Sequence, residues 1–263
     1  MIRNLFIACI PVFLFLPVFA HAESINSFDS QIEIFKDSSF SVTETIEYVF
    51  TEPRHGIFRY IPLIHQEPSE HFLKDRVIEV DLESVKIDGV NARYEQSSNR
   101  KQLNLKIGDP DVLISGIHTY TISYRIRGGL SYPKNQGAEF YYNVTGNGWE
   151  VPMQRVSATI YSPDTLFLSN RSCYRDIGRS NGSCSQSREE DGSIVFRITE
   201  LMPGEGMTIA QALDVRNVDR VLLERFKILW ILIPFGALLL SALGMYIYRF
   251  KTKYKTGRME TYE

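Results

Sequence analysis

Hydrophobic and polar residues alternate with a period of two over much of the middle of the chain. From Phe40 to Phe50 the even positions are apolar, apart from Glu44, and polar residues fill most positions between them. The same alternation recurs in the segments 102–107, 119–126, 156–160 and 194–198. This period is typical of strands that bury one face, and Asp88-Gly89 between two further runs is a hairpin signal. About eight to ten short strands at this spacing predict an all-β fold, an antiparallel β-sandwich, with a barrel as the second choice.

An uncharged apolar run occupies Ile228 to Tyr248 near the C-terminal end. Its 21 residues, at about 1.5 Å each in a helix, are enough to cross a hydrocarbon layer about 30 Å thick. We therefore predict a single C-terminal transmembrane α-helix over residues 228–248. Apolar residues at helical spacing within 218–227 predict a helical stalk continuous with this span, in a juxtamembrane segment 214–227. A separate helix on the lipid surface is the alternative.

The first 22 residues have the three parts of a secretory signal peptide. Arg3 supplies the positive charge, Leu5 to Phe19 the apolar core, and Ala20-His21-Ala22 the small-residue cleavage pattern. We therefore expect residues 1–22 to be removed by cleavage after Ala22. An uncleaved anchor or a buried helix is the alternative, which the two prolines of the apolar core disfavour.

Positive charges follow the predicted span, with no acidic residue before Glu260. They are Arg249, Lys251, Lys253, Lys255 and Arg258. Cytoplasmic flanks of membrane helices carry such an excess of Lys and Arg. We therefore expect a single-pass protein of the cell membrane with a basic cytoplasmic tail, residues 249–263. Its sandwich domain, residues 23–213, is expected on the outer side, in the periplasm or at the cell surface.

Charge and composition describe the outer region as a folded, acidic domain. The chain has 263 residues, 44% of them hydrophobic, and a formal net charge of -2. Without Arg3 and the five basic tail residues, 23 Lys and Arg remain, and without Glu260 and Glu263, 29 Asp and Glu remain, a formal charge of -6. This length buries a sizeable core. The acidic balance argues against nucleic acid as a partner.

Two cysteines, Cys173 and Cys184, lie outside the predicted signal peptide. They flank a polar segment in which Asn181-Gly182 can turn. In an oxidising compartment such an even pair predicts a disulfide. A metal pair or a redox centre is the alternative, but the chain has no C-x-x-C motif and no histidine close to this segment.

Residues suited to catalysis or metal binding form no recognisable motif. None of the four histidines of the outer region stands in an H-E-x-x-H arrangement, and no G-x-S-x-G or phosphate loop occurs. His65, Glu67, Glu70 and His71 have ligand-type side chains, but Pro68 interrupts them and a charged surface loop accounts for them equally well. We expect no catalytic residue, no metal and no cofactor.

The segment from Pro53 to Pro62 combines cationic groups with aromatic rings. Arg54 and Arg59 have the planar fork that binds carboxylates and phosphates, and His55 adjoins Arg54. These three residues are therefore candidates for a binding site. The alternative, which we favour, is a structural corner in which the arginines pair with acids and the rings fill the core.

A second candidate segment runs from Tyr141 to Pro152. Its glycines permit positive φ, and its aromatic residues suit a carbohydrate or peptide surface. The alternative, again favoured, is a fixed turn beneath a buried tryptophan. The candidate binding residues here are Tyr142, Asn143, Asn147, Trp149 and Glu150.

Four stretches of the chain resemble the DUF2207 family of predicted bacterial membrane proteins. They are RHGIFRYIP at 54–62, YYNVTGNGWEVPM at 141–153, the loop from Cys173 to Cys184, and MPGEGMTIA at 202–210. The similarity spans Ile25 to about Leu213, with the four stretches in the family's order. It implies a β-rich domain outside the membrane and no established catalytic residue to carry over. Longer members continue into further spans and a low-complexity tail, so roles that rest on those parts are not implied for this chain.

Three classes of function follow. The first and favoured one is a non-catalytic, membrane-anchored binding or assembly module whose outer domain meets an envelope protein, a glycan or another subunit. Another membrane or envelope protein is the expected partner. The second is an envelope enzyme, a hydrolase acting on wall or lipid material, with Arg54, His55 and Glu150 as its acid–base set. The third is a ligand sensor, which needs a cytoplasmic partner because the tail is too short for an effector domain.

Overall fold

The computed structural model of the protein describes residues 23–63, 74–99, 101–133, 137–162, 166–175, 184–226 and 228–259. The predicted signal peptide, the cluster from His65 to His71 and the last four residues of the predicted tail lie outside the described residues.

Strands dominate the described chain before the C-terminal helix. They are β1 (Ser24–Ile34), β2 (Phe40–Arg54), β3 (Gly56–Pro62), β4 (Lys74–Arg76), β5 (Glu79–Ile87), β6 (Val90–Asn91), β7 (Tyr94–Ser98), β8 (Gln102–Gly108), β9 (Ile114–Arg127), β10 (Ala138–Asn143), β11 (Val156–Tyr161), β12 (Phe167–Arg175), β13 (Ser185–Arg188), β14 (Ile194–Ile198), β15 (Met207–Leu213) and β16 (Glu224–Phe226), followed by α1 (Ile228–Met259).

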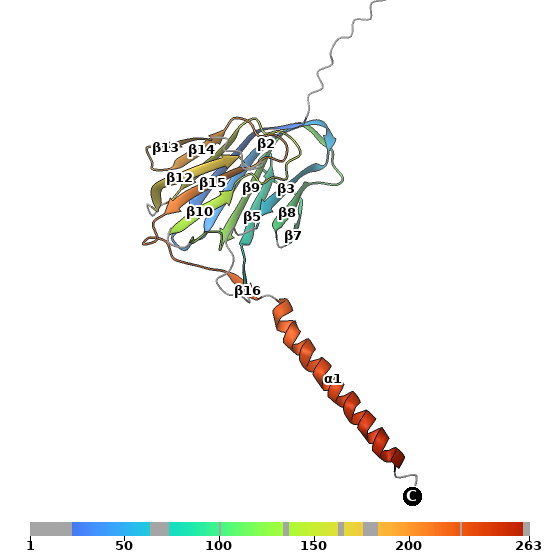
Figure 1. Ribbon diagram of the computed structural model, residues 1–263. Coiled ribbons are helices and arrows are strands. Elements are labelled where there is room, and N and C mark those ends of the chain that lie inside the picture. Colours follow the sequence, from blue (N-terminus) through green and yellow to red (C-terminus); the bar gives the residue numbers. More distant parts are fainter. Residues whose placement is uncertain are drawn as a thin grey trace, which may run out of the picture.

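An eight-stranded sheet, ordered β13-β14-β11-β1-β2-β9-β5-β6, forms one layer of a sandwich (Figure 1). Two three-stranded sheets, β10-β15-β12 and β3-β8-β7, form the facing layer. The ring of Phe40 on β2 lies 5.0 Å from that of Phe140 and 5.4 Å from that of Tyr142, both on β10, so aromatic contacts join the layers. Within the described sheets every neighbouring pair is antiparallel except β1 and β11. The predicted all-β sandwich with one C-terminal helix is confirmed.

The alternation seen in the sequence determines which face of each strand is buried. Buried and half-buried residues alternate along β2 from Phe40 to Phe50. The strand pairs antiparallel with β9, Phe40 opposite Ile126 and Glu44 opposite Ile122, so the inward rows of both strands lie on one face. Together with inward residues of β1 and β11, these rows form the main part of the core.

The hairpin predicted at Asp88-Gly89 connects β5 and β6. Asp88 and Gly89 have φ of 51° and 81°, and two successive positive φ values match the twist of a two-residue hairpin. The Asp88 carboxylate accepts a hydrogen bond from the backbone N–H of Thr119 at 2.9 Å and contacts Nδ1 of His118 at 2.7 Å. These bonds lower the pKa of the Asp88 carboxyl, and they fix the turn against β9.

The chain between β15 and the helix differs from the predicted helical stalk. Residues Glu224–Phe226 form the short strand β16, which pairs antiparallel with β4. Backbone bonds to a distant strand therefore replace the local helix that the apolar spacing suggested. The helix begins at Ile228, as predicted, but continues to Met259, beyond the expected end at Tyr248.

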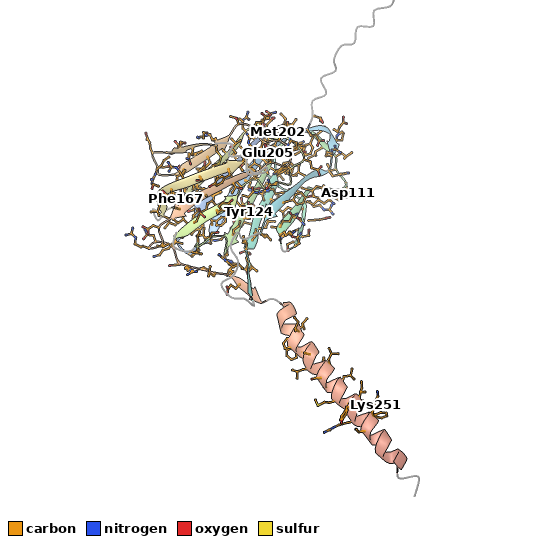
Figure 2. The ribbon with its side chains drawn as sticks, viewed as in Figure 1. Asp111, Tyr124, Phe167, Met202, Glu205 and Lys251 are labelled. Carbon is orange, nitrogen blue, oxygen red and sulfur yellow. A yellow bond between two sulfur atoms is a disulfide. The ribbon has the colours of Figure 1, made fainter. Side chains whose placement is uncertain are left out.

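The helix is long and apolar enough over residues 232–252 to cross a membrane. Its described side chains lie outside the sandwich, with Leu239 72% exposed, and Figure 2 shows them clear of the β-sheets as far as Lys251. An apolar helix that the sandwich leaves uncovered fits a lipid environment.

A disulfide joins Cys173 of β12 to Cys184, which directly precedes β13. The two Cα atoms are 5.7 Å apart, within the usual range for this bond. β12 and β13 are edge strands of different sheets. The predicted disulfide is therefore present, and it links the two layers covalently at one edge.

Removing this link is expected to destabilise the fold without preventing folding. In the chain-entropy model, a disulfide that closes so short a loop stabilises the fold by less than about 3 kcal/mol. We expect the double variant Cys173→Ser/Cys184→Ser to lose up to that amount in urea unfolding of the full chain in detergent. Reduced wild type should match the variant. Equal unfolding of the variant and the oxidised wild type would contradict a closed disulfide.

Candidate functional site

The first candidate segment alternates between the core and the surface along β3. Ile57 and Ile61 point into the core, and Arg59 between them is also buried, with 1% of its surface exposed. Phe58 and Tyr60 point outward, and their rings stack at 6.3 Å. The period of two therefore places a guanidinium in the interior of the sandwich.

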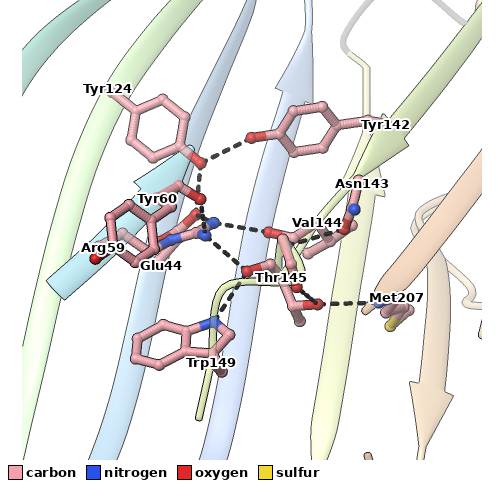
Figure 3. A network of polar contacts seen from close by, with 11 residues as sticks. Glu44, Arg59, Tyr60, Tyr124, Tyr142, Asn143, Val144, Thr145, Trp149 and Met207 are labelled. Carbon is pink, nitrogen blue, oxygen red and sulfur yellow. Dashed lines mark hydrogen bonds and ion pairs between the residues drawn. The ribbon is translucent and has the colours of Figure 1, made fainter. Parts of the chain in front are cut away.

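All five N–H groups of Arg59 have acceptors, shown in Figure 3. Nε and Nη2 donate to the two oxygens of Glu44 on β2, at 2.7 and 2.6 Å. The other donors reach the backbone carbonyls of Tyr60 at 2.7 Å, Thr145 at 2.6 Å and Val144 at 2.9 Å. The hydrogen-bonded guanidinium joins three segments of the chain and has no N–H group left to bind a ligand.

Two tyrosines complete the buried network. The hydroxyl of Tyr124 on β9 donates to Oε1 of Glu44 at 2.5 Å and lies 2.9 Å from the hydroxyl of Tyr142. Burial and the Glu44 carboxylate raise the pKa of both tyrosines, so both stay neutral. Burial disfavours the charged form of Arg59, but the Glu44 carboxylate outweighs it and raises the pKa of the guanidinium. The core therefore contains one ion pair with neutral hydroxyls around it.

The second candidate segment forms a turn that is held by its own side chains. Oδ1 of Asn143 accepts the N–H of Gly146 at 2.9 Å, and Nδ2 of Asn143 donates to Oδ1 of Asn147 at 2.6 Å. Gly146 has a φ of 69°, which a residue with a Cβ rarely adopts. Nε1 of Trp149 donates to the carbonyl of Thr145 at 2.9 Å, and its ring is buried. This is the fixed turn over a buried tryptophan that the sequence offered as its alternative.

The structure thus separates the predicted site residues into two groups. Arg59 and Trp149 meet in the core at the carbonyl of Thr145, and Tyr142 joins the same network through the hydroxyl of Tyr124. Arg54 is exposed and pairs with Glu23 at 2.9 Å, and Nδ1 of His55 lies 3.0 Å from the carbonyl of Val112. Glu150 is exposed.

These contacts support the structural alternative for the buried group. The proposed acid–base role of Arg54, His55 and Glu150 stays a prediction.

Among the described residues, no group of three His, Cys, Asp or Glu side chains is close enough together to hold a metal ion. The cluster at His65 to His71 lies outside the described residues, so the surface-loop interpretation of that cluster stays a prediction.

Sequence reasoning missed Glu44 as the partner of Arg59. A signal existed, because Glu44 is the one acid in the inward row of β2 and Arg59 the one base in the inward row of β3. A buried charge needs a partner of opposite sign. What the sequence lacks is the information that β2 and β3 lie in facing layers.

Exposed apolar side chains occur close together at the start of β9. Val112, Leu113 and Ile117 are 51%, 59% and 60% exposed, and we call residues 112–117 the tip segment. It lies at one end of β9, whereas Gly128, just beyond the other end, sits against Leu223 near β16. The tip segment therefore projects from the end of the sandwich opposite the helix.

Comparison with known proteins gives one family. A model of the N-terminal domain of a predicted membrane protein, DUF2207, matches residues 24–213. No curated protein matches the chain.

The solved structures to which the chain is similar include the following peptidases and a hydrolase. For an M1 zinc metallopeptidase from Deinococcus radiodurans the identity is 13% and the TM-score 0.41, over 71% of this chain and 42% of that one. For a putative protease from Parabacteroides distasonis the identity is 9% and the TM-score 0.41, over 72% of this chain and 40% of that one. For yeast LTA4 hydrolase the identity is 14% and the TM-score 0.42, over 73% of this chain and 29% of that one. This chain spans less than half of each of them, and similarity at this level carries no argument about activity.

Proposed function

The chain belongs to the DUF2207 family of predicted membrane proteins, and from this premise we propose that its β-sandwich is a membrane-anchored binding or assembly module. The helix α1 holds the module at the membrane, and the basic residues after the span support an outward-facing sandwich. The partner is another protein of the membrane or envelope. The module acts by contact and carries out no reaction.

The tip segment is the observation that carries this proposal. Single exposed apolar residues are common on protein surfaces, but three within six residues are typical of a contact surface. β9 ends at Arg127 and continues for ten residues beyond the tip segment, so at about 3.3 Å per residue it separates the tip segment from the helix end by about 33 Å. A surface at that distance suits a partner that also projects from the membrane.

The contacts of the candidate residues favour binding over catalysis. The arginine best placed for an electrostatic role, Arg59, is used entirely inside the core. Arg54 is neutralised by Glu23, and His55 contacts a backbone carbonyl. An enzyme needs an acid or a base within reach of a substrate, whereas an assembly module needs only a surface of suitable shape and chemistry.

Charge placed on the tip segment is expected to abolish partner binding. We predict that Leu113→Glu/Ile117→Glu removes the protein that co-purifies with the tagged full chain after crosslinking in intact cells. Val215→Glu, an equally exposed apolar position after β15, is the matched control and should retain it. Both variants should keep the wild-type melting temperature. Retention of the partner by the tip variant, or its loss from both variants, would contradict the proposal.

A further inference from the structure

A groove runs along the outer face of the small sheet β10-β15-β12, on the side away from the core. It has a volume of about 310 Å³. Its floor is the middle strand, where Ala210 and Ala212 point outward with side chains of a single methyl group. The residues that flank them on β10 are larger, since Tyr141 stands opposite Ala210 and Glu139 opposite Ala212. Small residues between larger ones leave the depression.

The walls of the groove combine an aromatic ring with polar groups of several kinds. Glu139 lines one side, and Asn170, Arg171, Ser172 and Tyr174 line the other. The ring of Tyr174 is 37% exposed. Arg171 stands opposite the buried Gln211 and so belongs to the core-side row of β12, whereas Glu139 stands opposite Ala212 on the outer face, and its carboxylate disfavours an anionic ligand. The disulfide at Cys173 lies between two of these residues along β12 and limits the movement of this wall.

The ladder of the small sheet argues against an extended peptide as the ligand. β15 pairs with β10 on one side and with β12 on the other, so its backbone N–H and C=O groups are used within the sheet. A peptide that joins a sheet needs the free edge of a strand. A ligand over β15 must therefore be recognised by side chains alone. The methyl groups, the aromatic ring and the mixed hydrogen-bond donors and acceptors of this face suit a molecule with apolar faces and many hydroxyls.

We propose that this groove binds a neutral saccharide of one or two rings. The volume is at the lower end of the range for small-ligand sites. The ring of Tyr174 packs on an apolar sugar face, and Glu139, Asn170 and Ser172 contact hydroxyls. The site is separate from the tip segment and goes beyond the proposed assembly function, since a module could bind both a glycan and a protein.

Saturation-transfer NMR on the full chain tests this site. The protein is kept in a detergent without a sugar headgroup, and the probes are glucose, galactose, N-acetylglucosamine, cellobiose and the disaccharide of N-acetylglucosamine. N-acetylmuramic acid is an anionic control, and trialanine is a peptide control. We expect transfer to at least one neutral sugar and none to either control. No transfer to any neutral sugar, or stronger transfer to the anionic or peptide control, would overturn the proposal.

Two variants locate the binding. Tyr174→Ala should weaken binding about tenfold, the loss expected for one well-packed ring, and Ala210→Phe should abolish binding by filling the floor. Tyr94→Ala removes a similarly exposed tyrosine on β7 and should leave binding unchanged. Circular dichroism checks that each variant folds, and Tyr174→Ala still decides the question if Ala210→Phe does not fold. Binding unchanged in a folded Tyr174→Ala would overturn the site, whereas the crosslinking of the tip segment would be unaffected.

Discussion

Arg59→Met is expected to lower the free energy of unfolding by about 3–5 kcal/mol, the cost of leaving one member of a buried ion pair without its partner. The methionine fills most of the space, but the Glu44 carboxylate stays buried with only the Tyr124 hydroxyl as donor. The carbonyls of Tyr60 and Val144 also lose the hydrogen bond from Arg59, whereas the carbonyl of Thr145 keeps the one from Nε1 of Trp149. Each unpaired buried group adds to the loss. Urea unfolding of the full chain in detergent, followed by near-UV circular dichroism, measures the effect.

Three further variants separate charge from geometry in this network. Arg59→Lys keeps the charge but has three donors instead of five, and should recover little of the stability. Glu44→Gln keeps the shape and removes the charge, and should also destabilise, since it leaves the guanidinium unpaired. Arg54→Met removes an exposed arginine that pairs with Glu23 and should change stability by less than about 1 kcal/mol. Stability within about 1 kcal/mol of wild type for Arg59→Met would show that the core does not depend on the pair.

Gly56→Ala is expected to cost about 3 kcal/mol or more, because strain and a steric clash coincide at this residue. Gly56 has a φ of 138°, and a Cβ there would lie 1.9 Å from the carbonyl oxygen of Ile107. Its partner in the β3–β8 ladder is also a glycine, Gly108, where a Cβ would lie 1.8 Å from the oxygen of His55. The two glycines let the backbones of β3 and β8 approach at the point where the ladder begins.

Gly89→Ala is the matched control for this clash. Gly89 also has a positive φ, of 81°, but nothing lies within 4 Å of the added Cβ. Only the conformational cost remains there, about 1–2 kcal/mol. Thermal melting of the two variants should place Gly56→Ala clearly below Gly89→Ala. Equal melting temperatures would mean that β3 and β8 can move apart at this end without a loss of stability.

Local patterns predicted most of the layout of the fold. Alternation identified the inward rows of β2 and β9, Asp88-Gly89 predicted a hairpin, and the uncharged run predicted the helix. Each of these features depends on neighbours in sequence, so a single chain reveals it. The same alternation places Arg59 in the inward row with Ile57 and Ile61.

Contacts between distant segments could not be predicted in this way. The pairing of Glu44 with Arg59 depends on two layers facing each other, and β16 depends on backbone bonds to β4 rather than on its own apolar spacing. The groove needs the register of three strands, because Ala210 forms a floor only between Tyr141 and Ser172. Sequence predicts which faces are buried, but not which residue meets which across a sheet or a core.

Photo-crosslinking from the tip segment tests the assembly function most directly. A photoreactive amino acid is placed at Leu113 of the full chain in intact cells, and in a separate strain at Ser98, an exposed position on β7. The account predicts one dominant crosslinked membrane or envelope protein from position 113, identified by mass spectrometry, and none from position 98. No crosslinked protein from position 113 in a folded, membrane-inserted chain, or the same products from both positions, would contradict it.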